Sequence, residues 1–309
     1  MIFFADFRND EAMHPSEAGI LNFVAESDAK VTFARLREFF KIKSRANTQD
    51  LKRLVAGLIQ RGSLCYTSHF GSSFLEISYA RPTAVSERVV IKPVGCTANL
   101  APDQRVVTLS RGAAFGGGEH PTTRLAIQLI DAVLSLPGCR QRTQTLRAID
   151  IGTGSGILAI VAAKFGIGFV CGVDTDPCAV FEACENLHIN RVQNTVVVVE
   201  GDLNAADGVY DIALANLRSP TLLAIRDTLQ KKINPESLLI FSGLKPEEIG
   251  QIREFYKKVG FFMCQKRSEN GWSAICLTRG AWPVDELQPM AEHWPRHDRL
   301  KNDLSRADP

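Results

Sequence analysis

The sequence predicts an α/β fold: a Rossmann-like, seven-stranded and mostly parallel sheet with one antiparallel strand, preceded by a small winged helix-turn-helix-like domain. Three observations predict it. From residue 146 to 278, apolar segments of strand length alternate with segments of helical periodicity. Glycines at alternate positions join the first of these strands to the first helix. The last two strand candidates flank Asn270-Gly271, a strong hairpin signal, which places the antiparallel strand near one edge.

We expect the 309 residues to form four segments. Residues 1–82 make the N-terminal domain, and residues 83–111 a linker with short strands. Residues 112–279 make the α/β domain. Residues 280–309 are polar, contain prolines and lack periodicity, which predicts a disordered tail.

Composition narrows the class of protein. Hydrophobic residues make up 45%, enough for a sizeable core, and the net charge of +2 by itself implies no polyanionic partner. There is no run of 18 apolar residues and no signal-peptide pattern at the start, so we expect neither a membrane span nor secretion. The eight cysteines are scattered without a CxxC pair, which favours buried thiols over disulfides or zinc. These features predict a cytoplasmic protein.

The N-terminal segment has the element order of a winged helix. Helical patterns cover residues 15–26 and 32–40 and start again at Asn47-Thr48, and strand-like runs follow at 63–68 and 73–79. Residues 30–61 contain nine basic and two acidic side chains. Such a surface predicts contact with nucleic-acid phosphates, and the alternative is a solvated face used for protein contacts or dimerisation.

The glycine turn after the strand at 146–151 is the first candidate site. Its glycines are Gly152, Gly154 and Gly156. Glycine allows a tight turn and a close approach of the backbone to a ligand. The spacing is GxGxG, with Ile157 where a dinucleotide fingerprint has its last glycine, and Asp150 precedes the turn. This combination favours S-adenosylmethionine over NAD, and the alternative is a plain structural turn.

Further polar residues end the following strands, where an open α/β sheet binds ligands. Asp174 closes the second strand and suits the two ribose hydroxyls of the cofactor. Asp202 closes the third and suits the adenine amino group, while Asp150 either orients the turn or faces the cationic part of the cofactor. Asn216 ends the fourth strand, where its amide oxygen is suited to hold an incoming amine. Methyl transfer is an in-line displacement that depends mainly on positioning the nucleophile.

A second glycine-rich segment spans residues 114–124 and leads into a helix that Pro121 opens. It is suited to fold over a bound ligand, with His120, Thr122 and Thr123 as polar contacts. A simple loop with a helix cap explains the pattern equally well.

Residues 89–279 resemble the ribosomal protein L11 methyltransferases. The matching segments are residues 114–123, 150–160, 174–177, 179–180, 215–217 and 242–244, together with Asn186 and Gly271-Trp272. The glycine turn is common to many methyltransferases, whereas the segment at 114–123 is far more specific. The resemblance implies a class I methyltransferase that uses S-adenosylmethionine to methylate lysines and the N-terminal amine of ribosomal protein L11 or a relative. It also implies that His120, Thr122 and Thr123 contact the cofactor and that Asn216 is catalytic.

The sequence departs from the family pattern at four places. Gly117 stands where the family has threonine, Glu119 where a small or polar residue is usual, and residues 109–112 lack an Asp-Pro pair. The family's small N-terminal α/β domain is replaced by the winged-helix-like segment. Two alternatives therefore stay open: methylation of RNA, DNA or a small molecule recruited through that segment, and a ligand-sensing DNA-binding regulator without catalysis. Asn216-Leu217-Arg218-Ser219 is unlike the NPPY tetrapeptide of enzymes that methylate bases or glutamine.

Overall fold

The computed structural model describes residues 15–27, 30–44, 47–69, 71–110, 112 and 114–283. The described chain divides into two compact units between Ser78 and Tyr79. The expected tail lies outside the described residues from position 284 on. The four-segment division drawn from the sequence stays a proposal.

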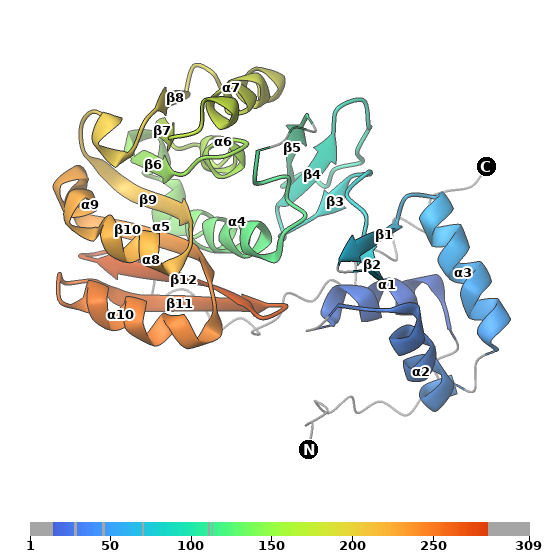
Figure 1. Cartoon of the computed structure of the whole chain (residues 1–309). Helices are drawn as coiled ribbons and strands as arrows, with labels where there is room; N and C mark the ends of the chain where they lie inside the picture. The colour runs from blue at the N-terminus through green and yellow to red at the C-terminus, as the bar shows by residue number, and fades with distance from the viewer. Residues whose placement is uncertain are drawn as a thin grey trace. The chain divides into compact units, whose positions relative to one another are not determined.

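The first unit contains three helices and a hairpin (Figure 1). Its elements are α1 (Glu17–Glu26), α2 (Phe33–Ser44), α3 (Thr48–Gln60), β1 (Leu64–His69) and β2 (Ser72–Ile77). The side chains of Ser16 and Asn47 cap α1 and α3 by accepting hydrogen bonds from backbone amides of the first turn. Phe40 and Leu58 are fully buried between the helices and the hairpin. The element order agrees with the expectation, and the assignment as a winged helix stays a prediction.

The second unit begins with a small three-stranded sheet of β3 (Thr83–Ala84), β4 (Val89–Pro93) and β5 (Arg105–Leu109). β4 runs parallel to β5 and antiparallel to β3. Alternate apolar residues of the small sheet, including Ile91 and Val107, are buried in the same core as residues of α4 (Pro121–Leu134) and α6 (Ile157–Lys164).

The main sheet has seven strands in the order β11-β12-β10-β9-β6-β7-β8. They are β6 (Arg147–Ile151), β7 (Phe169–Asp174), β8 (Val196–Glu200), β9 (Tyr210–Asn216), β10 (Ile233–Leu244), β11 (Phe262–Glu269) and β12 (Trp272–Arg279). Only β12 runs antiparallel to its neighbours, one place from the edge, so the predicted fold class is confirmed. The strand order reverses between β6 and β9, and open α/β sheets bind ligands at such a point.

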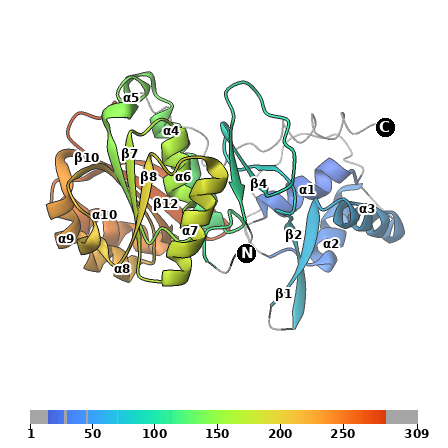
Figure 2. The same cartoon turned by 90° about the horizontal axis from the view of Figure 1, so that it is seen from above.

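Helices cover both faces of the main sheet (Figure 2). They are α4 (Pro121–Leu134), α5 (Pro137–Arg140), α6 (Ile157–Lys164), α7 (Pro177–Asn190), α8 (Ser219–Ala224), α9 (Arg226–Lys232) and α10 (Ile249–Lys257), with short 3₁₀ turns at Thr143–Thr145, Leu203–Ala205 and Pro246–Glu248. Alternate residues of β6 enter different cores: Ala148 packs with α4 and α6, and Ile149 with the side of α8 to α10. No helix in the described ranges has the length and apolar character needed to cross a bilayer.

α8 and α9 are separated at Ile225. β10 starts at Ile233, and its pairing with β9 is irregular between Ile233 and Leu238.

Candidate functional site

The glycine turn lies where β6 passes into α6. Gly152, Gly154 and Gly156 have φ angles of 68°, 56° and 80°, in the left-handed region that favours glycine. The Gly152 amide donates to the carbonyl of Val173 (2.9 Å), and the Gly154 amide to Oδ2 of Asp174 (2.9 Å). The turn is thus bound to the end of β7, which brings two sets of predicted cofactor residues together.

The glycine-rich loop, residues 114–120, docks on this turn. The Ser155 amide donates to the carbonyl of Phe115 (2.9 Å), and its hydroxyl donates to the carbonyl of Gly116 (2.9 Å). The Asn186 side chain donates to the Ser155 carbonyl (2.9 Å) and so ties α7 to the turn. The loop's backbone therefore has a defined place beside the turn.

Gly154→Ala should lower the free energy of unfolding by about 1–3 kcal/mol and loosen this loop. A Cβ at Gly154 would clash with the carbonyl oxygen of Phe115, and its backbone would be strained. Gly117→Ala is the matched control, because a Cβ there meets no atom within 4 Å. Urea unfolding checks this prediction, and equal stabilities of the two variants would contradict it.

Asp150 is fully buried beneath the turn. Its Oδ2 accepts from the Thr153 hydroxyl (2.8 Å) and from the Ala159 amide (3.1 Å), so it orients the turn and the start of α6. Burial raises the pKa of Asp150 to about 7, although both hydrogen bonds lower it. Of the two roles that the sequence allowed, these contacts favour orientation of the turn.

Asp150 makes stability depend on pH. Between its unfolded value of 3.8 and about 7, the folded chain keeps a proton that the unfolded chain has released. Stability therefore falls as pH rises through this window, with the full loss above pH 7. We expect Asp150→Asn to flatten this slope in denaturant titrations at several pH values, and the exposed Asp227→Asn to leave it unchanged. A slope of Asp150→Asn equal to that of the wild type over this range would refute the assignment.

The N-terminus of α4 brings together four more of the predicted residues. His120 caps the helix: its Nδ1 lies 2.8 Å from the Thr122 hydroxyl and accepts from the Thr122 amide (3.3 Å). The Asn216 side chain at the end of β9 donates to the Thr123 hydroxyl (3.3 Å). The Ser242 hydroxyl of β10 donates to the Thr122 carbonyl (2.7 Å). Both threonines are buried, so in this structure they position His120 and Asn216.

A row of aromatic rings borders this cluster. The His120 ring lies 5.3 Å from that of Phe115 and 5.2 Å from that of Trp272, measured between centroids. Phe115 is 55% exposed, unusual for so large an apolar side chain. Neither Phe115 nor Trp272 is among the site residues predicted from the sequence. In the sequence, Phe115 directly precedes three glycines, and this position was the signal that could have identified it.

Asp202 stands apart from this cluster. It is exposed beyond β8, where its carboxylate accepts from the backbone amide of Asn204 (2.8 Å) and starts a 3₁₀ turn. Asp174 ends β7 and Asp202 follows β8, the neighbouring strand of the sheet. Its role toward adenine stays a prediction.

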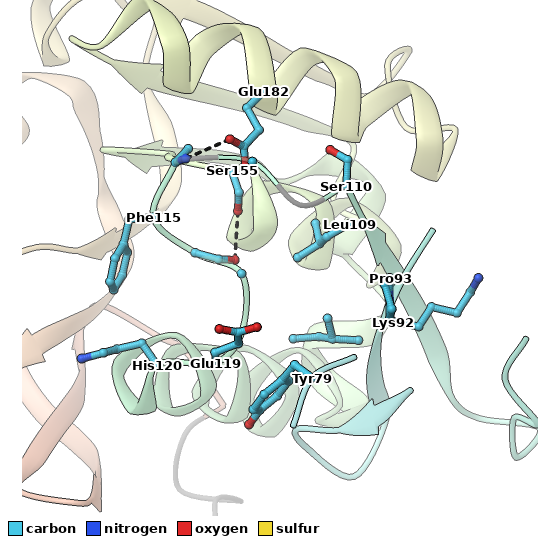
Figure 3. A pocket seen from close by; sticks show the side chains of 15 residues that line it. Tyr79, Lys92, Pro93, Leu109, Ser110, Phe115, Glu119, His120, Ser155 and Glu182 are labelled. Atoms are coloured by element: carbon cyan, nitrogen blue, oxygen red, sulfur yellow. Dashed lines mark hydrogen bonds between the residues drawn. The ribbon is translucent and has the colours of Figure 1, made fainter. Parts of the chain in front are cut away.

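A pocket of about 500 Å³ lies between the glycine-rich loop and the small sheet (Figure 3). Tyr79, Lys92, Leu109 and Glu182 line it, together with loop residues. Of the ten predicted site residues only His120 borders it. The pocket thus adjoins the strand-end cluster without containing it.

The buried pair of Arg124 and Glu269 was not foreseen. Arg124 on α4 donates to both carboxylate oxygens of Glu269 at the end of β11 (2.6–3.2 Å). It also donates to the Tyr79 hydroxyl (2.8 Å) and to the Glu119 carbonyl (2.5 Å). Burial lowers the pKa of Arg124, but Tyr79 and Glu269 outweigh it and hold the pKa above its usual value. The Arg124 side chain therefore connects the glycine-rich loop, α4 and the hairpin of β11 and β12.

This sheet order, with a glycine turn after its central strand and a polar cluster at the switch point, defines a Rossmann-like class I methyltransferase. Residues 75–280 match the family model of the ribosomal protein L11 methyltransferase (PrmA). The chain belongs to the ribosomal protein L11 methyltransferase family.

Individual relatives support this assignment to the family. The chain is 34% identical over 197 residues to the ribosomal protein L11 methyltransferase of Clostridium perfringens, covering 64% of this chain and 60% of that protein. It is 34% identical over 220 residues to that of Chloroflexus aurantiacus, covering 63% and 65%. The crystal structure of a ribosomal protein L11 methylase from Lactobacillus delbrueckii subsp. bulgaricus has a TM-score of 0.58 and 28% identity, covering 65% of this chain and all of that one. The match thus spans about three fifths of the length of the first of these relatives.

Proposed function

We propose that this chain transfers methyl groups from S-adenosylmethionine to amines of a protein, with ribosomal protein L11 as the acceptor. The observation that carries the proposal is the convergence of the glycine turn, Asp174 and Asn216 on one edge of the sheet in a member of this family. The activity and the acceptor follow the names of relatives that match over the catalytic part.

The residues at this edge fit the cofactor. Asp174 accepts amides from Gly154 and Asp176, and a carboxylate has lone pairs beyond those two bonds for ribose hydroxyls. The amide oxygen of Asn216 has no partner among the described residues. We therefore assign ribose binding to Asp174, adenine to Asp202, and contacts with the methionine part to the turn glycines and to the His120–Thr123 segment.

S-adenosylmethionine supplies a methyl group activated by its sulfonium. The chain's own task is to hold the acceptor amine in line and without its proton. The hydrogen bond to the Thr123 hydroxyl supports this role for Asn216, because it engages the amide nitrogen and leaves the amide oxygen for the acceptor amine. The rings of Phe115, His120 and Trp272 form an aromatic border next to Asn216's neighbour Thr123 on α4.

Radiolabelled methyl transfer into a fractionated cell lysate tests the proposal. Label in the L11 band of the ribosomal proteins is the expected result. Label in RNA would move the function to nucleic-acid methylation, and cofactor binding without any label would leave a ligand-sensing regulator. We place this reaction in the cytoplasm, where ribosomal proteins are made.

We further propose that the first unit contacts nucleic acid through α2 and α3. Arg35, Arg37, Lys41, Lys52 and Arg53 are exposed on these helices. Phosphate contacts of this kind depend strongly on salt. The full chain should bind duplex DNA or ribosomal RNA at low salt, and Lys52→Gln/Arg53→Gln should weaken binding about 3–10-fold. Filter binding across a salt series measures this, and salt-independent or absent binding would refute it.

A further inference from the structure

Two cations lie over the ring of Trp272, at the edge of the sheet where we place the acceptor. Lys245 Nζ is 3.7 Å from the centroid of its ring, and the Arg218 guanidinium is 5.2 Å away. These three residues, the cationic rim, come from the ends of three adjacent strands. Asn216 pairs with Ser242, and Leu244 with Ser273, so β9, β10 and β12 end side by side.

The strand order places the rim on the acceptor side of the site. Asp174 and Asp202 follow β7 and β8 on one side of the glycine turn. Arg218 follows Asn216 by two residues on the other side, and Lys245 comes directly after β10. The edge is therefore acidic where we place the cofactor's nucleoside and cationic beyond Asn216.

The two cations of the rim lack an acidic partner within the described chain. Neither Arg218 nor Lys245 has a carboxylate oxygen within ion-pair distance among the residues described. Glu269 pairs with Arg124, Glu248 accepts from the backbone amide of Lys245, and Glu119 lines the pocket. Contact with an indole face orients a cation without neutralising it.

We propose that Arg218 and Lys245 select an acceptor segment that carries a carboxylate next to its reactive amine. This inference rests on the proposed function. A bound sulfonium adds a third positive charge to this edge of the sheet, so an acidic acceptor segment complements it and a basic one is repelled. Contact with the Trp272 ring orients both cations, and the rim is a specificity site separate from the Asn216 amide.

Two synthetic peptides test the proposal on the full chain with S-adenosylmethionine. Both carry one free lysine; in one it is flanked by glutamates and in the other by glutamines. We expect the acidic peptide to have about 10-fold higher kcat/KM, mainly through KM. Arg218→Gln/Lys245→Gln should reduce this preference to within about 2-fold and leave cofactor affinity, measured by calorimetry, unchanged.

A matched control removes two charges elsewhere. Lys231→Gln/Lys257→Gln replaces exposed cations near the C-terminal ends of α9 and α10 and should keep the preference. Equal kcat/KM for both peptides, or a preference that survives in the rim variant, overturns the inference while the methyltransferase function stands. Label in RNA and in neither peptide overturns the function as well.

Discussion

Asp174→Ala should weaken the binding of S-adenosylmethionine about 100-fold or more. The carboxylate has two functions that alanine removes together. It holds the Gly154 amide (2.9 Å) and the Asp176 amide (3.1 Å), and its remaining lone pairs are those assigned to the ribose. Loss of the first function loosens the turn, and loss of the second removes charge-assisted hydrogen bonds to the ligand. Isothermal titration calorimetry measures the change.

Asp176→Ala is the matched control for that experiment. Asp176 lies two residues away and accepts from the Cys178 amide as the cap of α7 (2.9 Å). Its loss should lower stability by about 1 kcal/mol with little effect on cofactor affinity. Equal affinities of wild type and Asp174→Ala would refute the role of Asp174.

Arg124→Leu should lower the free energy of unfolding by about 3–5 kcal/mol. The substitution leaves the Glu269 carboxylate, whose side chain is 11% exposed, without its cation. It also removes the donor to the Glu119 carbonyl, which precedes the helix cap. Denaturant unfolding followed by circular dichroism measures the loss.

Two variants separate this cause from a general effect of losing arginine. Arg124→Leu/Glu269→Leu removes both charges and should be more stable than the single variant. Arg253→Leu breaks an exposed pair with Glu254 and should change stability by less than about 1 kcal/mol. An Arg124→Leu variant as stable as Arg253→Leu would contradict the importance of the buried pair.

Local patterns predicted the α/β part of the fold because its signals are short in sequence. The apolar strand before Gly152 and the helix after Gly156 lie within one continuous stretch. Asn270-Gly271 gave the hairpin directly, and both residues have positive φ angles. Asp174 and Asn216 were identifiable because parallel strands bring their ends to one edge.

Local sequence patterns could not predict contacts between segments that are distant in the sequence. Arg124 and Glu269 are separated by 145 positions, and nothing local marks either as a partner of the other. Trp272 is likewise a hairpin residue whose two cations follow different strands. Thr122 and Thr123 are a further case. Their polarity predicted ligand contacts, which stay a prediction, and the structure shows in addition that both are buried and contact His120 and Asn216.

Intact-mass measurement on purified ribosomal protein L11 tests methylation by this chain most directly. After incubation with the chain and S-adenosylmethionine, the mass of L11 should rise by whole methyl groups, and Asp174→Ala at the same concentration should abolish the increase. An unchanged mass of L11, while calorimetry shows the cofactor bound to the wild-type chain, would contradict the proposed reaction.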